Sequence, residues 1–185
     1  VIKSSEILKI NDKDFIDTLR EQIANLPPLM IGDDGAIQEW AKKYQRSDPS
    51  HRHSSHLHSL FPLDQISFTK NPELIVASKK SLENQTSDPN WEDTEWSTAN
   101  MLCFNARMKE TEKSYEWLQN LFRRFMRENL MTVSPAGIAL AEYDIFSFDA
   151  NEAAVAGMCE MLIQCYDGQV EFLPALESAS LTALL

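Results

Sequence analysis

Two long helical segments with almost no chain between them constrain the fold of this protein more than any other feature. Residues 95–108 and residues 111–129 carry apolar side chains at the three- and four-residue spacing of one helix face. Only the short link around Lys109 and Glu110 separates them. Helices joined by so few residues run antiparallel as neighbours. The sequence therefore predicts a helical hairpin at the centre of the fold.

Further segments with helical spacing lie on both sides of this hairpin. They are expected to cover residues 12–26, 51–61, 72–82 and 150–165. A polar loop is predicted over residues 83–93, and the strand pattern is confined to residues 170–173. Helix pairs joined by long loops are typical of an all-α fold, either an α-solenoid or part of an α/α toroid. Because no repeat of fixed period is present, the named solenoid families are disfavoured.

The charge of the chain bears on the partners it can take. Among 185 residues, 28 acids stand against 17 lysines and arginines, which gives a formal net charge of −11. Nucleic-acid binding is driven by clustered Lys and Arg side chains, so this balance argues against a nucleic-acid partner. A hydrophobic content of 43% is that of a globular domain with its own core.

No targeting or membrane-spanning segment is found in the sequence. No run of 18 or more apolar residues occurs, so no membrane partner is expected. The chain starts at Val1 rather than at methionine, and residues 1–10 look like the end of a helix. We therefore expect the chain to be cut from something longer, and its compartment cannot be read from a targeting signal.

All four histidines lie in one octapeptide, residues 51–58, and this clustering marks a candidate site. An imidazole binds metals, transfers protons near neutral pH or hydrogen-bonds a polar ligand. As metal ligands, His53 and His56, or His51 and His58, would supply neutral nitrogens beside a carboxylate. Their spacing does not match the His-Glu-x-x-His signature of zinc enzymes, and no bracketing Cys or acidic ligands are present. We therefore predict no metal and no other cofactor.

Two other interpretations of the octapeptide remain open. In the first, the histidines are satisfied structurally at the start of a helix that Ser50 or Ser54 caps. In the second, Arg52 and the adjacent imidazoles converge on the hydroxyls or the carboxylate of a polar ligand. Tryptophans in or beside loops favour the second interpretation, because an indole stacks on a sugar face. These tryptophans are Trp40, Trp91 and Trp96.

An acid and an amide at the start of the alanine-rich helix form a further candidate site. Asp149 and Asn151 stand at the mouth of the helix predicted over residues 150–165. An aspartate just before a helix acts as an N-cap or as an acid or base in catalysis, and one role does not exclude the other. Both roles stay open for Asp149.

Several segments of the chain together match the pattern of one enzyme family. Residues 35–40 read GAIQEW, residues 48–57 read DPSHRHSSHL, Trp96 opens a helix, and residues 148–176 run from FDAN to LPAL. They resemble the catalytic domain of glycoside hydrolase family 95, the inverting α-L-fucosidases. The corresponding family motifs are Gly-Gln-Leu-Gln-Glu-Trp, Asp-Pro-x-His-Arg-His-x-Ser-His-Leu, Gly-Trp-Ser, and a run from Asp-Gly-Asn to Leu-Pro-Ala-Leu. The histidine segment is the most specific match, and the matches span about residues 12–176.

The resemblance implies a fold, a reaction and a division of the chain. The fold would be an (α/α)6 toroid, with residues 1–176 as its second half and residues 177–185 as a divergent or truncated tail. The reaction would be the removal of terminal α-1,2-linked L-fucose, or L-galactose, from oligosaccharides by inverting hydrolysis with water. The partner would be a fucosylated oligosaccharide or glycan, and the parent protein would be secreted or periplasmic.

The resemblance also implies a role for each candidate residue. Asp149 would be the carboxylate of the catalytic base. The remaining candidates would bind the substrate, with Arg52 and His53 on the fucose hydroxyls, His56 in support, and Asn151, Trp40 and Trp96 shaping the same pocket.

One half of the catalytic machinery is not matched within the chain. Inversion needs one carboxylic acid to protonate the leaving oxygen while a carboxylate on the opposite face activates water. The general acid of the family, a glutamate, and its asparagine pair would lie upstream of Val1, in the missing N-terminal half of the same parent protein. We therefore expect this chain alone to be inactive. The main alternative is a decayed, non-catalytic helical paralogue with weak sugar binding, which is suggested by departures from the family pattern at Glu95, Ala150 and Glu152.

Overall fold

A computed structural model gives the structure of the chain and describes residues 1–10, 12–44, 46 and 48–176. The chain divides into two compact units, residues 1–30 and residues 31–185. The tail predicted over residues 177–185 lies outside the described residues. The structure is mostly helical with only short strands, which confirms the predicted fold class and agrees with part of a helical toroid.

The first unit consists of two short helices, α1 (Ile2–Leu8) and α2 (Lys13–Ala24). Helix α2 starts where the sequence predicts, because the Asp12 side chain accepts a hydrogen bond from the Phe15 backbone N–H. An exposed ion pair joins the two helices, with Arg20 Nη2 lying 3.2 Å from Glu6 Oε1. Exposed pairs of this kind contribute little to stability.

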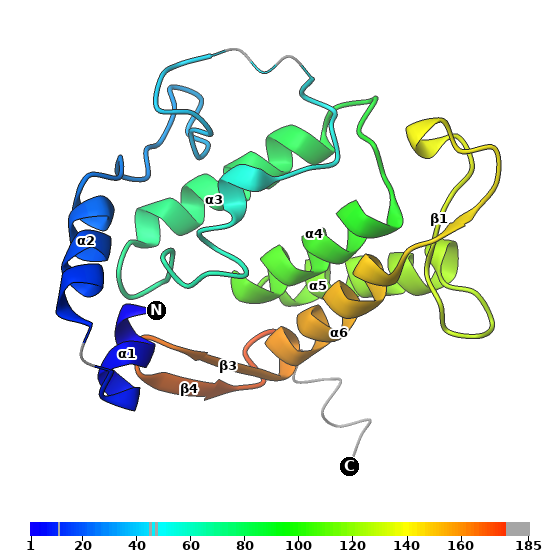
Figure 1. Cartoon of the computed structure of the whole chain (residues 1–185). Helices are drawn as coiled ribbons and strands as arrows, with labels where there is room; N and C mark the ends of the chain where they lie inside the picture. The colour runs from blue at the N-terminus through cyan, green and yellow to red at the C-terminus, as the bar shows by residue number, and fades with distance from the viewer. Residues whose placement is uncertain (11, 45, 47, 177–185) are drawn as a thin grey trace. The chain divides into compact units, whose positions relative to one another are not determined.

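Among the described residues, the second unit holds the other helices and the strands (Figure 1). Its helices are α3 (Pro72–Thr86), α4 (Glu95–Arg107), α5 (Thr111–Asn120) and α6 (Phe148–Leu162). Short helical turns are η1 (Ser55–Leu57), η2 (Leu121–Phe125), which is a π-helical continuation of α5, and η3 (Ile138–Leu140). Two antiparallel strand pairs complete it: β1 (Val133–Ser134) with β2 (Ile145–Phe146), and β3 (Ile163–Tyr166) with β4 (Gln169–Phe172).

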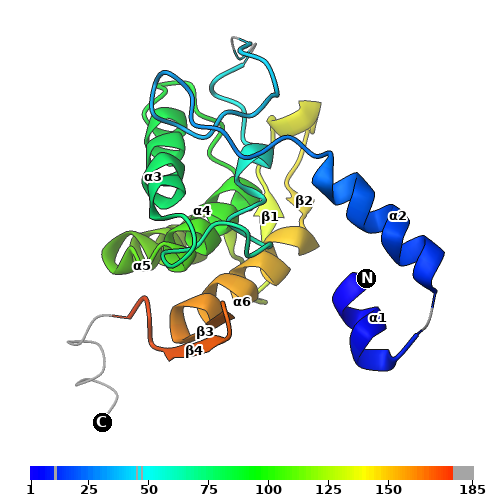
Figure 2. The same ribbon diagram turned by 90° about the vertical axis from the view of Figure 1, so that its left-hand side faces the viewer.

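Helix α4 is the centre of this unit (Figure 2). It starts at a capping box in which Thr94 and Ser97 exchange side-chain and backbone hydrogen bonds, and nearly all its residues are buried. Ala106 packs in one cluster with Leu118, whereas Ala99 packs with Leu121 and Phe125. Contacts near the end of α4 are thus made within α5, and contacts near the start of α4 are made after the end of α5. This order shows that α4 and α5 are antiparallel. The predicted helical hairpin is therefore confirmed.

Helices α4 and α6 run in the same direction. Ala99 packs with Ala150 and Ala154 near their starts, and the Arg107 guanidinium pairs with Glu160 near their ends. Because α4 and α6 pack directly against each other in parallel, both N-terminal ends lie on the same side of the unit (Figure 1). This arrangement matters for the site because it places residues that are far apart in sequence at one end of the helix pair.

Gly157 allows α4 and α6 to pack closely. A Cβ atom at this position would lie 2.5 Å from Leu102 Cγ and 2.8 Å from its Cδ2, and Leu102 is fully buried. We expect Gly157→Ala to destabilise the protein by about 1–3 kcal/mol, because overpacking outweighs the better helix propensity of alanine. Urea unfolding measures the loss. In a Leu102→Ala background the same change should cost almost nothing, and an equal cost in both backgrounds would contradict the proposed clash.

The structure corrects the predicted bounds of several elements. Residues 51–61 do not form a helix: only η1 is helical there, and Leu57 and Leu60 are fully buried through a series of turns. Helix α3 extends to Thr86, into the segment predicted as a loop, because Gln85 is buried and hydrogen-bonded. The helix predicted over residues 150–165 ends at Leu162, since the following residues pair with β4. Tertiary contacts override local propensity in each case.

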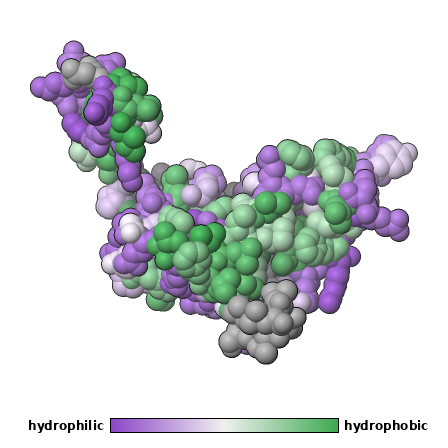
Figure 3. Space-filling view, turned by 90° about the horizontal axis from the view of Figure 1, so that it is seen from below, coloured by the Kyte–Doolittle hydropathy of each residue, from purple (hydrophilic) through white to green (hydrophobic). Residues whose placement is uncertain are grey.

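Apolar side chains lie on one face of α6 and of the hairpin that follows it. Figure 3 shows apolar surface on the face of the molecule seen from below. The exposed apolar residues of these elements include Val155, Leu162, Ile163, Val170 and Phe172. Within the described residues, no helix is long and apolar enough to cross a membrane.

Candidate functional site

The N-terminal ends of α4 and α6 form one part of the candidate site. Trp96 is the second residue of α4 and is half-buried, and Asp149 is the second residue of α6 and is exposed. Because the helices are parallel, both side chains belong to the same end of the helix pair. The free backbone N–H groups there give this end a partial positive charge, which favours negative groups and hydrogen-bond acceptors.

Arg52 is attached to the same end through the loop before α4. Its Nη1 donates to Glu92 Oε2 at 2.8 Å, and the Glu92 backbone N–H donates to the carbonyl of Ser50 at 2.9 Å. The hydrogen bond from Arg52 holds the pKa of the Glu92 carboxyl below its usual range. The Arg52 side chain keeps 24% of its surface exposed, so Glu92 fixes its position while part of the guanidinium side chain stays accessible to solvent.

Gln85 holds residues 51–58, the histidine loop, against α3, and this role was not predicted from the sequence. Its Nε2 donates to the carbonyls of His51 and His53 at 2.7 and 3.2 Å, and its Oε1 accepts from the Ser54 hydroxyl at 2.8 Å. The side chain is fully buried. A buried glutamine near the end of a helix is the signal that could have revealed it, because a buried amide needs partners and loop carbonyls supply them.

His51 and His53 lie beside Arg52 and contact each other. Their rings are 4.6 Å apart in an edge-on arrangement, and the His53 backbone N–H donates to His51 Nδ1 at 3.1 Å. Burial, together with the charges of His51 and Arg52, lowers the pKa of His53. The lowered pKa favours the neutral ring, in which one nitrogen donates and the other accepts a hydrogen bond. We call Arg52, His53, Trp96 and Asp149 the helix-end site.

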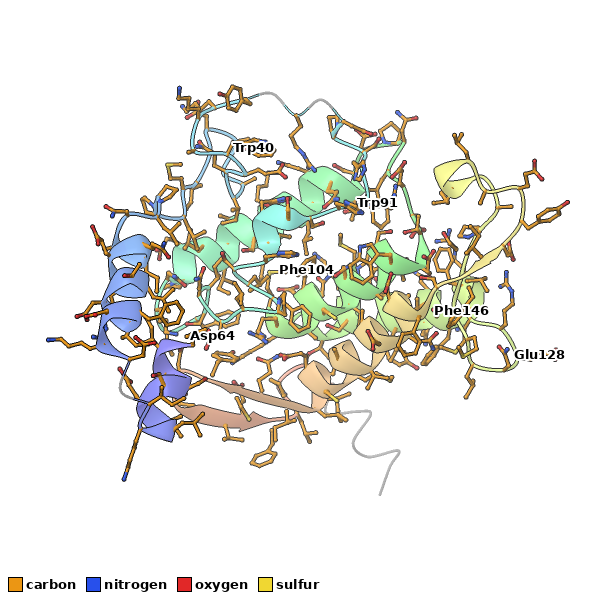
Figure 4. All side chains as sticks on the ribbon, viewed as in Figure 1. Trp40, Asp64, Trp91, Phe104, Glu128 and Phe146 are labelled. Atoms are coloured by element: carbon orange, nitrogen blue, oxygen red, sulfur yellow. The ribbon has the colours of Figure 1, made fainter. Side chains whose placement is uncertain are left out.

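His56 lies apart from this group and lines a cavity of about 420 Å³ with Trp40. The cavity is formed by loop residues within 32–44, by Arg46 and Pro49, and by Ser81 and Asn84 of α3. Figure 4 shows Trp40 on this loop, away from Trp91 at the far end of α3. We call this cavity the loop pocket. The structure thus divides the predicted residues between two places, where the sequence predicted one pocket.

Asn151 and Asp149 take different positions at the start of α6. Asn151 Oδ1 accepts from the backbone N–H and the hydroxyl of Thr132, both at 2.9 Å, and its Nδ2 donates to the Leu130 carbonyl at 2.8 Å. Its amide therefore ties the loop before β1 to α6. Asp149 is not the N-cap, since α6 starts at Phe148 and Ser147 holds the cap position. The capping role considered for Asp149 is therefore wrong.

In the part of the chain that the structure describes, no three His, Cys, Asp or Glu side chains gather as ligands for a metal ion. The backbone carbonyls of His51 and His53 accept hydrogen bonds from Gln85, and His56 lines the loop pocket, which His51 and His53 do not. The groups that this site presents to a ligand are hydrogen-bond donors, acceptors and aromatic faces.

Among the histidines of the two sites, His56 in the loop pocket is expected to have the largest effect on how stability depends on pH. Burial, with the nearby charge of Arg46, lowers the pKa of His56 to about 4, against about 6.5 in the unfolded chain. The unfolded chain therefore binds this proton first, so stability is lost as the pH falls from 6.5 towards 4, by about 3 kcal/mol in all. Urea unfolding at pH 7, 5.5 and 4.5 measures the loss.

Two variants identify the origin of that pH dependence. His56→Gln should flatten the change in stability between pH 7 and 4.5, because the glutamine side chain does not titrate. His58→Gln, which removes an exposed histidine two residues away, should leave the change as it is. If both variants retain the full pH dependence, His56 is not its source.

Comparison with known proteins identifies the family of the chain. The family model described as the glycosyl hydrolase family 95 catalytic domain matches residues 1–162. The chain belongs to this family. It is also 31% identical over 188 residues to the protein named alpha-L-fucosidase 2 from Arabidopsis thaliana, an alignment that covers 95% of this chain and 21% of that protein. The chain thus spans about a fifth of the length of this relative.

Membership of the family confirms the resemblance seen in the motifs. The matched residues include the whole histidine loop, the loop pocket and the start of α6. The helix-end site and the loop pocket are therefore both parts of a family 95 catalytic domain.

Proposed function

We propose that this chain is part of an α-L-fucosidase-like glycoside hydrolase that removes terminal α-1,2-linked L-fucose, or L-galactose, from oligosaccharides. The observation that carries the proposal is the helix-end site. It combines an exposed carboxylate, Asp149, with a guanidinium and a neutral imidazole at the shared end of two parallel helices. Sugar hydroxyls bind well to such groups, because each hydroxyl both donates and accepts hydrogen bonds.

In this proposal the residues act as follows. Arg52 and His53 hold hydroxyls of the terminal sugar, and Trp96 offers an indole against the sugar ring. Asp149 accepts a proton from water, and that water attacks the anomeric carbon on the face opposite the leaving group, so the configuration inverts. The water oxygen forms the new bond, and the bond to the leaving oxygen breaks as that oxygen receives a proton.

The second proton transfer needs another carboxylic acid, on the leaving-group side. In an inverting glycosidase the two carboxyl groups flank the scissile bond, so Asp149 cannot perform both steps in one event. We propose that a glutamate from the preceding part of the parent protein supplies this acid, and that this chain alone is inactive. The fucosylated oligosaccharide and that part of the parent are then the partners of the chain.

The test is an assay of fucose release from an α-1,2-fucosylated trisaccharide, followed by proton NMR of the product. The full-length parent should release fucose with inverted anomeric configuration, and residues 1–185 alone should release none. A parent that releases no fucose would refute the fucosidase proposal. Retained configuration in the first product would refute the inverting mechanism, and fucose release by residues 1–185 alone would refute the proposed inactivity.

A non-catalytic sugar-binding function is the second candidate. The departures from the family pattern at Glu95, Ala150 and Glu152 favour it, since Glu152 adds an exposed charge near the start of α6. In that case the full-length parent should bind L-fucose, seen in saturation-transfer NMR, and hydrolyse no fucoside. Hydrolysis by the full-length parent removes this candidate.

A further inference from the structure

The backbone that carries Arg52 and His53 lies outside any helix or strand. Within the histidine loop only η1 is helical, and both residues come before it. A loop backbone holds one conformation only where other groups pair with its polar atoms and offset the entropy of ordering it. The positions of the two proposed sugar-binding side chains therefore depend on partners outside the loop.

Gln85, near the end of α3, is the partner of this backbone. Its Nε2 atom donates to the carbonyls on both sides of Arg52, that of His51 at 2.7 Å and that of His53 at 3.2 Å. Its Oε1 atom accepts from the Ser54 hydroxyl at 2.8 Å. Three hydrogen bonds from one side chain thus span the backbone from which Arg52 and His53 project.

The support behind these bonds is rigid. Gln85 is fully buried, and so its amide is shielded from water. It belongs to a regular helix whose Leu82, three residues earlier, packs in the main hydrophobic core. Buried hydrogen bonds from a regular element hold a loop more precisely than exposed bonds within the loop do. Gln85 therefore transmits the position of α3 to the histidine loop.

A different residue, Glu92, binds the Arg52 side chain. Its Oε2 atom accepts from Arg52 Nη1 at 2.8 Å. Glu92 thus orients the guanidinium, whereas Gln85 fixes the backbone on which the guanidinium and the His53 ring are carried. Loss of Gln85 would leave the ion pair in place but release the loop carbonyls from α3.

We propose that Gln85 is a positioning residue for sugar binding, which fixes the backbone of residues 51–54 so that Arg52 and His53 reach hydroxyls of the same terminal sugar. This inference rests on the proposed function and adds a residue that makes no contact with the sugar. Because Gln85 acts on the binding groups and not on Asp149 of α6, its loss weakens sugar binding more than it slows proton transfer.

Gln85→Met in the full-length parent tests this role, because methionine is similar in size to glutamine but donates no hydrogen bond. KM for an α-1,2-fucosylated trisaccharide should rise about 10- to 100-fold, since small displacements of binding groups have effects of this size. The change in kcat should stay below about threefold, as expected when binding to the ground state and the transition state is lost equally.

Gln164→Met is the matched control. Gln164 is also a buried glutamine, and its Nε2 atom donates to two carbonyls, that of Ala106 at 2.7 Å and that of Glu160 at 3.0 Å. Both carbonyls lie near the ends of α4 and α6, whereas the helix-end site lies at their starts. Both variants should lower the midpoint of urea unfolding, and only Gln85→Met should raise KM. An equal rise of KM in both would overturn the inference.

Gln85→Glu provides a second test that keeps the shape of the side chain. A carboxylate donates no hydrogen bond, whereas a protonated carboxyl donates one, and burial raises the pKa of a carboxyl. The KM of the variant divided by that of the parent at the same pH should therefore be larger at about pH 9 than at about pH 5. An equal ratio at both pH values would contradict the role of Gln85 as a donor.

The outcomes separate this inference from the proposed function. A parent that hydrolyses no fucoside overturns both together. A parent that hydrolyses the trisaccharide, with a KM that Gln85→Met does not change, overturns the inference alone.

Discussion

Arg107→Ala is expected to cost about 3–5 kcal/mol of stability, the largest loss from any single side chain discussed above. The Arg107 guanidinium donates to both carboxylate oxygens of Glu160 at 2.8 Å, and to the carbonyls of Leu60 and Leu63 at 3.2 Å. Only 9% of its side chain is exposed. Removing it leaves a largely buried carboxylate and two carbonyls without their donor.

The same guanidinium lies between two aromatic rings, 5.5 Å from the centre of Phe61 and 5.3 Å from that of Tyr166. It therefore joins α4, α6, β3 and the loop after the histidines in one contact. Urea unfolding measures the loss. As a control, Lys80→Ala removes an exposed pair with Glu83 at 3.8 Å and should change stability by less than about 1 kcal/mol. Equal effects of the two variants would contradict the role of Arg107.

Asp149→Asn in the full-length parent is expected to lower kcat for fucose release by about 100- to 10,000-fold. Asparagine keeps the size of the side chain but cannot accept the proton of the attacking water. KM should change little, because Arg52 and His53 supply the contacts to the sugar in the proposed mechanism. Stability should change by less than about 1 kcal/mol, since the exposed Asp149 contributes only its interaction with the start of α6.

Glu152→Gln provides the matched control for Asp149→Asn. Glu152 is an exposed acid on the same helix, so the variant removes the same charge close to the same helix end. Its kcat should stay within about tenfold of the parent, because Glu152 takes no part in the proton transfer of the proposed mechanism and affects the reaction only through its electrostatic field. If kcat falls by the same factor in both variants, the loss comes from removing a negative charge near the start of α6, and Asp149 is not the base.

The parts of the fold that the sequence predicted well are those decided by local pattern. The hairpin of α4 and α5 follows from apolar spacing and a short link, and the start of α2 follows from Asp12 as its N-cap. The pattern failed at residues 51–61, where Leu57 and Leu60 have helical spacing yet lie in a series of turns. There the backbone carbonyls of His51 and His53 accept hydrogen bonds from Gln85, which lies 34 and 32 residues away.

The candidate site shows the same division between local and distant information. The sequence selected Trp40, His56, Arg52 and Asp149 by residue type and motif. It could not assign Trp40 and His56 to one place and Arg52 and Asp149 to another, because that separation depends on tertiary contacts. Glu92 binds Arg52 from 40 residues away, and Glu39 binds Ser55, next to His56, from 16 residues away.

The sequence by itself determined the helical class of the protein, its family and the chemical types of the residues in its site. Those properties depend on periodicity and on short motifs, which a linear chain carries. Only the tertiary structure decided that α4 and α6 are parallel, so that Trp96 and Asp149 share one end, and that His56 faces a cavity of its own. Packing at Gly157 and the buried ion pair of Arg107 set this arrangement, because they join residues about 50 positions apart.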